Sequence, residues 1–396
     1  MASLNICELN MPIEHYSPTS GGAVSTVIMQ RAKHLIAMGH RVSILAVDNG
    51  DATYDVGNVV PLSMPNRDSL HKVQRALLHF QNQWNQWEWP YYGHYIRSFS
   101  HALQNLKPTP DVVITHNDML ASRYVKKVLP NTPVVSWLHN ELSRPQSDMN
   151  TTIATTDRFV AVSRYIQDWT THQYPSLANK IEALHNGVDL DSFFPDENFP
   201  DVSHPLKVLF VGRTSADKGA DLAADAIWQL KQENLPISFT VAGSTWWHGV
   251  DDMDEPFFRE LKGKMDRAQA NYLGQIPRPE VPALMRKHDV VCVISRFNDP
   301  CPLVALEAMG TGCVVLASQR GGLPEICGQA AVYVDPDRPE TIAQALRRLA
   351  TNPETLRHYK RKSTAQATNL SWKTHSQILE TLLQSPSSKS LTESLY

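Results

Sequence analysis

The sequence lacks a long apolar run, a cysteine pair and any block of like charge. No stretch approaches the roughly 18 apolar residues that a membrane-spanning helix requires. Its five cysteines form no CxxC pair, and an odd number of cysteines argues against a disulfide framework. The formal net charge is −3, without the basic stripe that is typical of nucleic-acid binders. These absences argue against a membrane-spanning protein, a disulfide-rich domain and a nucleic-acid partner.

The first residues also lack the basic and apolar segments of a secretory signal peptide. Together with the cysteine pattern, this predicts a cytoplasmic protein. Residues 69–80 form an amphipathic pattern with Lys72 and Arg75, which leaves open a peripheral contact with an anionic membrane at its inner face. The sequence does not indicate an oligomeric state.

What is present is a repeated alternation of short β-branched runs and amphipathic stretches of helix length, which is typical of parallel sheets covered by helices. A chain of 396 residues is long enough for two such α/β domains. The Pro- and Asp-rich residues 194–205 have little hydrophobic periodicity and predict a linker. We therefore expect domains over residues 1–203 and 204–371, with a polar tail over 385–396.

The alternation predicts strands in both halves and one clear early helix. The helix is expected over 25–38, ending before Gly39. The expected strands are residues 4–9, 41–47, 112–115, 134–138, 159–162, 182–184, 206–211, 237–242, 271–273, 290–294 and 313–317. Open parallel sheets bind ligands at the carboxyl ends of their strands, so chemistry is expected there.

A glycine pair marks the first strand-to-helix turn. Gly21 and Gly22 leave room for backbone N–H groups to approach an anion at the start of the following helix. An ordinary turn has the same residues, so both interpretations stay open. A nicotinamide site with Asp48 as the ribose partner is a further alternative, but the GxGxxG spacing is absent.

The second half places charged residues after two of its expected strands. Arg213 and Lys218 follow residues 206–211 and could meet phosphate oxygens, or could be solvated loop charges. Asp299 precedes a helix expected to begin near Leu303, and Glu307 lies one turn into that helix. A carboxylate there could accept both hydroxyls of a ribose, or could serve only the helix dipole.

The order of these segments over nearly the whole chain resembles glycosyltransferase family 4. The resemblance includes RAKHLIAMGHRVSIL after the glycine turn, HNGVDLDSFFP before the linker, and SRFNDPCPLVALEAMG followed by GGLPEI. It implies the α/β GT-B fold: two Rossmann-like domains with a central cleft, and a C-terminal helix, here about 372–384, that crosses back to the N-terminal domain. The N-terminal domain would bind the acceptor and the C-terminal domain the nucleotide sugar.

The resemblance also implies roles for individual residues. Asp299 stands where family members usually have glutamate, which leaves the identity of the donor sugar open. His139 matches the family's histidine and would contact the donor sugar, with His116 as a weaker candidate. Arg213, Lys218, His139 and Asp299 are thus the expected catalytic residues. The expected donor-binding residues are Gly21, Gly22, Arg213, Lys218, Asp299, Leu303, Val304 and Glu307.

The acceptor is expected to be a hydroxyl on a glycan, a lipid or a small molecule. Aromatic residues Trp84, Trp87 and Trp89 could form its platform, or could pack on the core. Enzymes with this fold generally use no metal, and we expect neither a metal nor a cofactor; Asp251, Asp252 and Asp254 are interpreted as solvated. Trp246 and Trp247 could stack on a base or cover the sheet edge.

The resulting hypothesis is a retaining glycosyltransferase that uses a nucleotide diphosphate sugar, with UDP-sugars favoured and GDP-mannose second. Three alternatives remain: a catalytically silent nucleotide-sugar-binding protein, an epimerase and a phosphorylase of the same fold.

Overall fold

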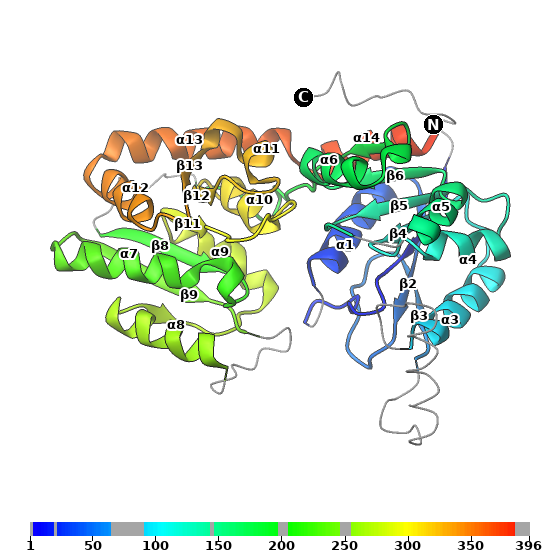
Figure 1. Ribbon diagram of the computed structural model, residues 1–396, viewed down its shortest axis with the longest axis horizontal. Coiled ribbons are helices and arrows are strands. Elements are labelled where there is room, and N and C mark those ends of the chain that lie inside the picture. The colour runs from blue at the N-terminus through cyan, green and yellow to red at the C-terminus, as the bar shows by residue number, and fades with distance from the viewer. Residues whose placement is uncertain are drawn as a thin grey trace. The chain divides into compact units, whose positions relative to one another are not determined.

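The computed structural model describes residues 3–19, 22–64, 91–142, 146–196, 205–245 and 255–384. The chain forms two α/β units, each with one parallel sheet between helices (Figure 1). The first unit comprises Met1–Leu184 and Ser376–Tyr396, and the second His185–His375. The fold is the two-domain Rossmann-like architecture that the sequence predicts.

Within the described residues, the sheet of the N-terminal unit has seven strands in the order β3-β2-β1-β4-β5-β6-β7, and all adjacent pairs are parallel. β1 and β4 lie beside each other at its centre, although about a hundred residues separate them along the chain. The strands are β1 (Asn5–Leu9), β2 (Arg41–Val47), β3 (Asn58–Leu62), β4 (Val112–His116), β5 (Val134–Leu138), β6 (Arg158–Ala161) and β7 (Ile181–Ala183).

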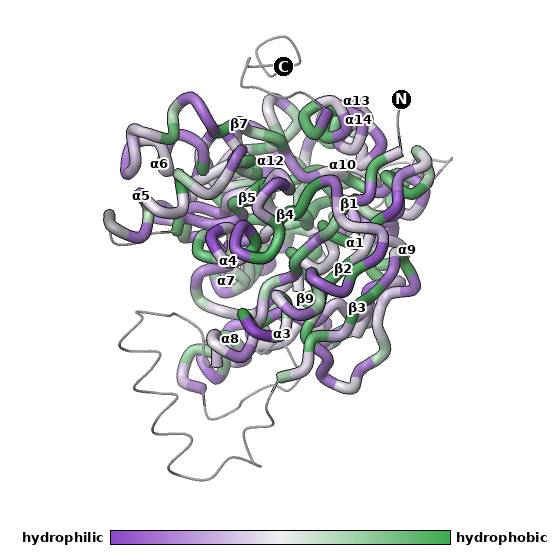
Figure 2. Tube along the Cα trace, turned by 90° about the vertical axis from the view of Figure 1, so that its right-hand side faces the viewer, coloured by the Kyte–Doolittle hydropathy of each residue, from purple (hydrophilic) through white to green (hydrophobic). Residues whose placement is uncertain are grey.

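Helices connect these strands and cover the sheet. Part of the core lies between the sheet and α3 and α4, where Tyr95 and Phe99 are fully buried. Figure 2 shows the mixed hydrophobic and hydrophilic residues along α4 that such a half-buried helix requires. The helices are α1 (Ala23–Ala37), α3 (Tyr92–Asn105), α4 (Ala121–Val128), α5 (Gln146–Thr155), α6 (Arg164–Gln173) and the 3-10 helix η2 (Pro175–Leu177).

The described part of the C-terminal unit forms a six-stranded parallel sheet in the order β10-β9-β8-β11-β12-β13. The chain runs outward from β8 to β10 and then returns to the other side of β8, so the strand order reverses between β8 and β11. The strands are β8 (Leu206–Val211), β9 (Ile237–Ala242), β10 (Asn271–Tyr272), β11 (Val290–Val293), β12 (Val314–Ser318) and β13 (Ala331–Val334). Ligands of doubly wound folds bind at such a switch point.

Amphipathic helices bury the faces of this second sheet. Its main hydrophobic cluster joins the sheet to α7, α8 and α12 through buried residues such as Ile227, Leu261 and Leu346. The helices of this unit are α7 (Ala220–Gln232), α8 (Pro256–Arg267), α9 (Val281–Arg286), α10 (Leu303–Gly310), α11 (Leu323–Cys327), α12 (Glu340–Thr351) and α13 (Pro353–Asn369), with 3-10 turns η3 (Ala216–Lys218), η4 (Arg278–Glu280) and η5 (Gly328–Ala330). They are followed by α14 (Trp372–Gln384).

Helix α14 begins in the C-terminal unit and continues into the N-terminal unit, because residues from Ser376 onward belong to the latter. Its Glu380 lies 3.2 Å from Nε2 of His40, which is also in the N-terminal unit. The chain therefore crosses back as the sequence resemblance implies.

The boundary between the two units does not lie at the expected linker. The N-terminal unit ends at Leu184, whereas the sequence places the domain boundary near residue 203. Residues 197–204 lie outside the described part of the chain. Residues after Leu184 pack on the C-terminal unit: the Asn186 side-chain amide donates to the carbonyl oxygen of Cys301 at 3.2 Å. Arg286 donates to the carbonyl oxygen of Ser192 at 3.1 Å.

Every strand that the alternation predicts is present to within two residues, and the early helix begins at Ala23. Of the strands in the described ranges, the sequence missed two, β3 and β13, and each lies at an edge of its sheet. Pro61 in β3 argues against a strand by sequence, but an edge strand tolerates proline because one side of its backbone needs no ladder hydrogen bonds. Among the described residues, no helix is long and apolar enough to cross a bilayer.

Candidate functional site

Two glycine turns meet at the carboxyl ends of β8 and β9. A Cβ atom at Gly243 would lie 1.8 Å from the carbonyl oxygen of Gly212, so only glycine fits at this position. The Gly212 amide donates to the carbonyl oxygen of Ala242 at 3.0 Å, and the Thr214 amide to that of Ser244 at 3.0 Å. This packing fixes the path of the chain that leads to Arg213 and Lys218.

Lys218 and Asp299 form an ion pair at the switch point between β8 and β11. The Lys218 ammonium donates to Oδ2 of Asp299 at 2.7 Å, with side-chain exposures of 27% and 8%. The same ammonium lies 4.5 Å from the centre of the Phe297 ring. The structure therefore brings together two of the residues that the sequence assigns to the donor.

The backbone around Asp299 is held by the turn that follows β12. The Gly322 amide donates to the carbonyl oxygen of Asp299 at 2.9 Å. Gly321 has a φ of +58°, and a Cβ atom there would lie 2.3 Å from the same carbonyl oxygen. Gly321 of GGLPEI is thus needed for close packing against the Asp299 loop.

Arg213 lies at the same end of β8 but is more exposed. Its guanidinium donates to Oγ of Ser215 at 3.1 Å and to Oδ2 of Asp217 at 3.1 Å. Burial raises the pKa of Asp217, but the Ser215 hydroxyl and the charges of Arg213 and Lys218 outweigh it and hold that pKa below its ordinary value. Asp217 is a second carboxylate among these cations that the sequence analysis did not single out.

Glu307 lies inside α10, and Arg278 from η4 is its partner. The Arg278 guanidinium binds both carboxylate oxygens of Glu307, at 3.0 Å for Nη1 to Oε2 and by a second, shorter contact from Nη2 to Oε1. The Glu307 side chain is 6% exposed and that of Arg278 35%. Each carboxylate oxygen retains a second lone pair, so Glu307 can still accept hydroxyl groups.

Arg278 was missed by the sequence analysis. The segment IPRPE contains it, but an arginine between prolines does not by itself indicate a partner. The signal would have been the requirement that a nearly buried glutamate has a cation or several donors nearby. Leu303 and Val304 are half-buried at the start of α10, whose N-cap residue Pro302 provides no side-chain cap.

The predicted anion site at Gly22 contains a carboxylate of the chain itself. Oε2 of Glu14 accepts from the Ser25 amide at 3.0 Å and from the Ser25 hydroxyl at 3.2 Å, at the start of α1. A Cβ atom at Gly22 would lie 2.6 Å from the carboxyl carbon of Glu14. The start of this helix is therefore occupied by the carboxyl group of Glu14; a role for Gly22 toward a diphosphate stays a prediction.

His139 follows β5 and contacts a buried polar cluster. Its Nε2 lies 2.9 Å from Nδ1 of His116, the last residue of β4. Nε2 of His116 lies 2.8 Å from Oε2 of Glu8 in β1, and Arg31 from α1 donates to both oxygens of Glu8. The two predicted histidines are thus brought together, while Glu8 and Arg31 were missed because a strand glutamate and a helix arginine carry no motif.

Several predicted residues lie outside the described part of the chain. Among residues 3–19, 22–64, 91–142, 146–196, 205–245 and 255–384, no three His, Cys, Asp or Glu side chains form a group that could hold a metal ion. The residues outside are Gly21, Trp84, Trp87, Trp89, Trp246, Trp247, Asp251, Asp252 and Asp254.

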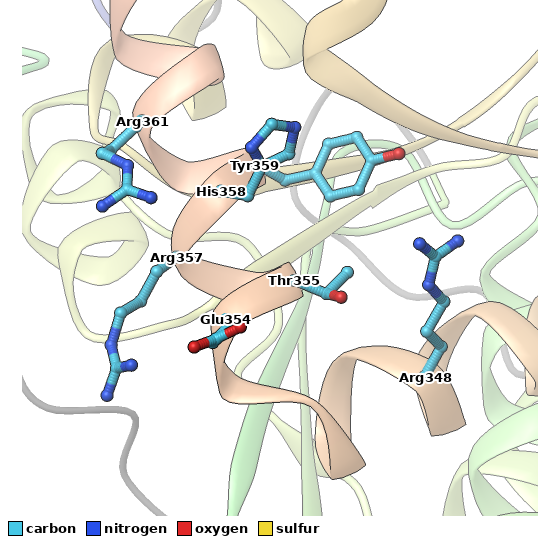
Figure 3. Close-up of a pocket in the computed structure, with 7 residues that line it drawn as sticks. All are labelled: Arg348, Glu354, Thr355, Arg357, His358, Tyr359 and Arg361. Carbon is cyan, nitrogen blue, oxygen red and sulfur yellow. The ribbon is translucent and has the colours of Figure 1, made fainter.

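A surface pocket lies on α12 and α13, with a volume of about 590 Å³ (Figure 3). Arg348 comes from α12, and the other lining residues come from the first turns of α13. None of the predicted donor-binding residues lines it. The pocket is open and basic, and the residue chemistry at the strand ends, rather than this hollow, defines the candidate site.

Two family models match consecutive parts of the chain. The model of Glycosyltransferase Family 4 matches residues 20–192, and that of glycosyl transferases group 1 matches residues 196–366. The chain belongs to glycosyltransferase family 4. The second match spans the Lys218–Asp299 and Glu307–Arg278 pairs, and the first spans His139.

Relatives of this glycosyltransferase are identical to it at about a quarter of the aligned positions. Spore coat protein SA of Bacillus subtilis is 26% identical over 281 residues, which are 65% of this chain and 73% of that protein. A glycogen synthase of Mycobacterium tuberculosis is 26% identical over 283 residues, or 67% of this chain and 66% of that enzyme. The alignments thus span about two thirds of each protein.

Solved structures show the same GT-B fold along nearly the whole chain. Anabaena HepE in complex with UDP and glucose has a TM-score of 0.71 at 18% identity, covering 96% of this chain and 99% of that one. Sucrose-phosphate synthase from Thermosynechococcus elongatus has a TM-score of 0.71 at 18% identity, covering 96% and 98%.

Proposed function

We propose that this glycosyltransferase transfers a sugar, with retention of configuration, from a nucleotide diphosphate sugar to a hydroxyl of a glycan, lipid-linked or small-molecule acceptor. The observation that carries the proposal is the pair of acid–base contacts at the switch point, Lys218 with Asp299 and Arg278 with Glu307. They provide cations for a diphosphate and carboxylates for sugar and ribose hydroxyls within one unit. UDP-sugars are the favoured donors, in keeping with HepE bound to UDP-glucose, and GDP-mannose is second.

Each side chain has one proposed task. The ammonium of Lys218 and the guanidinium of Arg213 stabilise the negative charge that grows on the leaving diphosphate, because fixed charges cost no reorganisation during reaction. Asp299 accepts hydrogen bonds from hydroxyls of the donor sugar. Glu307 accepts them from the ribose, while Arg278 holds its carboxylate in place.

The proposed reaction proceeds on one face of the sugar. The bond from the anomeric carbon to the phosphate oxygen breaks, and the acceptor oxygen bonds to that carbon from the same side. The proton of the acceptor hydroxyl passes to the leaving phosphate oxygen. Asp299 and Glu307 are each engaged by a cation, which favours this route over a covalent enzyme intermediate that needs a free carboxylate nucleophile.

A binding panel tests the proposal directly. UDP-glucose, UDP-N-acetylglucosamine, GDP-mannose and the free nucleotides are each added, and thermal unfolding is recorded. A ligand at 100 times its Kd stabilises the native state by about 2.7 kcal/mol, which gives a measurable rise in the unfolding temperature. No stabilisation by any member would refute the proposed donor class.

Product analysis then separates the remaining alternatives. The donor that stabilises the protein is incubated with candidate acceptors, and the anomeric configuration of the product is read by proton NMR. Retained configuration is the expected result, and inversion would refute the mechanism. Stabilisation without any transfer or donor hydrolysis would indicate a silent binder, and sugar isomers formed without acceptor would indicate an epimerase.

A further inference from the structure

The loop after β11 packs directly on the turn η3 at one edge of the C-terminal sheet. β8 and β11 are adjacent and parallel, so the segments that follow them, residues 212–219 and 294–299, leave the sheet at the same edge. Gly219 has a φ of +77°, and a Cβ atom there would lie 2.4 Å from the carbonyl oxygen of Ile294. The two backbones are therefore in contact, and a larger residue at this glycine would push them apart.

Arg296 joins the two segments through both its backbone and its side chain. Its backbone amide donates to the carbonyl oxygen of Asp217 at 2.8 Å, and Nη1 donates to that of Ala216 at 2.6 Å. Nη1 also donates to Oδ1 of Asp221 at 2.7 Å, and Nη2 donates to Oδ2 at 2.6 Å. One arginine thus binds two consecutive carbonyl groups of η3 and a carboxylate of α7.

Asp221 anchors the guanidinium because its own carboxylate is nearly buried. It lies in the first turn of α7, and its side chain is 5% exposed. A carboxylate removed from water requires a cation and hydrogen bonds, and Arg296 supplies both. Nζ of Lys264 lies 3.7 Å from Oδ2 of Asp221 and donates instead to Asp225 at 2.7 Å. The planar fork of an arginine matches two carboxylate oxygens at once, which a lysine ammonium does not.

Lys218 makes a contact in the opposite direction between the same two segments. It is the last residue of η3, and its ammonium donates at 2.7 Å to Asp299, in the loop that carries Arg296. The ammonium lies at the end of a flexible chain, so its place depends on where the backbone of η3 is held. Both carbonyl groups that Arg296 binds belong to the two residues directly before Lys218.

We propose that Arg296 is a positioning residue that holds η3, so that the ammonium of Lys218 stays beside Asp299 and meets the leaving diphosphate. The contact with the diphosphate rests on the proposed function. The guanidinium of Arg296 acts on the backbone and on Asp221 rather than on the donor. Because a misplacement of about 1 Å can lower a rate about a hundredfold, losing this contact should lower turnover while Lys218 itself is retained.

Crystal structures of the ligand-free wild type and of Arg296→Met, in the same crystal form, test the positioning directly. Methionine retains an apolar chain but cannot donate to the Ala216 carbonyl or to Asp221. We expect η3 and Nζ of Lys218 to be displaced by about 1 Å or more in the variant. An ammonium that keeps its wild-type place beside Asp299 would overturn the proposal.

Kinetics test whether Arg296 acts through Lys218. The value of kcat for donor hydrolysis or transfer is measured for Arg296→Met, Lys218→Met and the double variant. We expect Arg296→Met to lower kcat about tenfold to a hundredfold, and the double variant to be no slower than Lys218→Met alone. Losses that multiply in the double variant would show that the two residues act independently and would refute the proposal.

Arg347→Met is the matched control within the same unit. Arg347 on α12 also binds both oxygens of a carboxylate, that of Glu233. Its side chain is 35% exposed, against 33% for Arg296. The control therefore loses a comparable ion pair away from the predicted site residues, and its kcat should equal that of the wild type.

Asp221→Asn separates positioning from a direct contact between Arg296 and a phosphate, and it leaves no buried carboxylate without its cation. The amide retains the shape but has one acceptor oxygen instead of two. We expect kcat to fall, by less than in Arg296→Met. A wild-type kcat in Asp221→Asn beside a loss in Arg296→Met would indicate that Arg296 binds the donor itself, which would refute the proposal. If no nucleotide sugar reacts with the wild type, the proposed function fails, while the crystal structures still decide whether Arg296 positions Lys218.

Discussion

Replacing Lys218 by methionine separates its charge from its bulk. Methionine retains an apolar chain beside the Phe297 ring but removes the ammonium 2.7 Å from Asp299. At that distance and an effective dielectric constant of about 20, the attraction is about 6 kcal/mol before desolvation is subtracted. Because Lys218 is 27% exposed, solvent offsets much of it, and we expect a net loss of stability of about 1–2 kcal/mol.

The effect on turnover should be much larger. A fixed donor that stabilises developing charge contributes about 10²–10³ in rate, so kcat of Lys218→Met should fall by that factor with the best donor of the panel. Calorimetric unfolding is measured in parallel to verify that the C-terminal unit is folded. The control is Lys231→Met on α7, whose ammonium donates to the carbonyl oxygen of Ala268 at 2.7 Å and contacts no predicted site residue. A Lys218→Met enzyme within threefold of wild-type kcat would refute the assignment.

Three further changes test other contacts. Glu307→Gln should weaken UDP binding about tenfold or more, since hydrogen bonds to a charged group contribute about 1.5–3 kcal/mol. The binding of 2′,3′-dideoxy-UDP, which lacks the ribose hydroxyls, should be unaffected. Equal losses of affinity for both ligands in calorimetric titrations would contradict the ribose role. Gly321→Ala should destabilise the protein by about 2 kcal/mol or more, because the φ of Gly321 is +58° and a Cβ atom there would meet Asp299. Gly263→Ala is the control: it lies inside α8, with nothing within 4 Å of its Cβ position, and should stabilise the protein by about 0.5–1 kcal/mol in thermal unfolding. Burial raises the pKa of Glu14 more than hydrogen bonds from Ser25 and Val24 lower it. The protonated Glu14 side chain therefore stabilises the fold below the ordinary glutamate pKa of 4.5, and this stabilisation is lost as the pH rises through the raised pKa. Glu14→Gln lacks that loss, and its unfolding temperature relative to wild type should rise from about pH 4 to about pH 7; a constant difference would argue against a buried, raised carboxyl.

The fold could be predicted from the sequence because periodicity and parallel-strand connection rules act locally. The alternation of β-branched runs and amphipathic stretches places most of the strands, and right-handed crossovers restrict the orders in which they can pair. The order itself comes from the structure. β3 was missed because Pro61 argues against a strand, although an edge strand tolerates it. β13 was missed as well, whereas the edge strands β7 and β10 were predicted.

The partners of the site residues could not be predicted, because they come from distant parts of the chain. The family resemblance indicated Glu307, but Arg278 lies 29 residues earlier in a turn with no helical or strand pattern. His116 and His139 were singled out as separate candidates, and only the position of β4 between β1 and β5 joins them to Glu8. Glu14 occupies the helix start that the glycine turn was expected to leave for a ligand. Side-chain pairing depends on tertiary contacts, which a local pattern does not contain.

The path of α14 has a consequence for biosynthesis. Because the N-terminal unit includes Ser376–Tyr396, it cannot be completed while the ribosome is still making the C-terminal unit. His40 can contact Glu380 only after the more than three hundred residues between them have been synthesised. The half that is translated first therefore depends on the residues that are translated last, so that shortening α14 would remove part of the N-terminal unit.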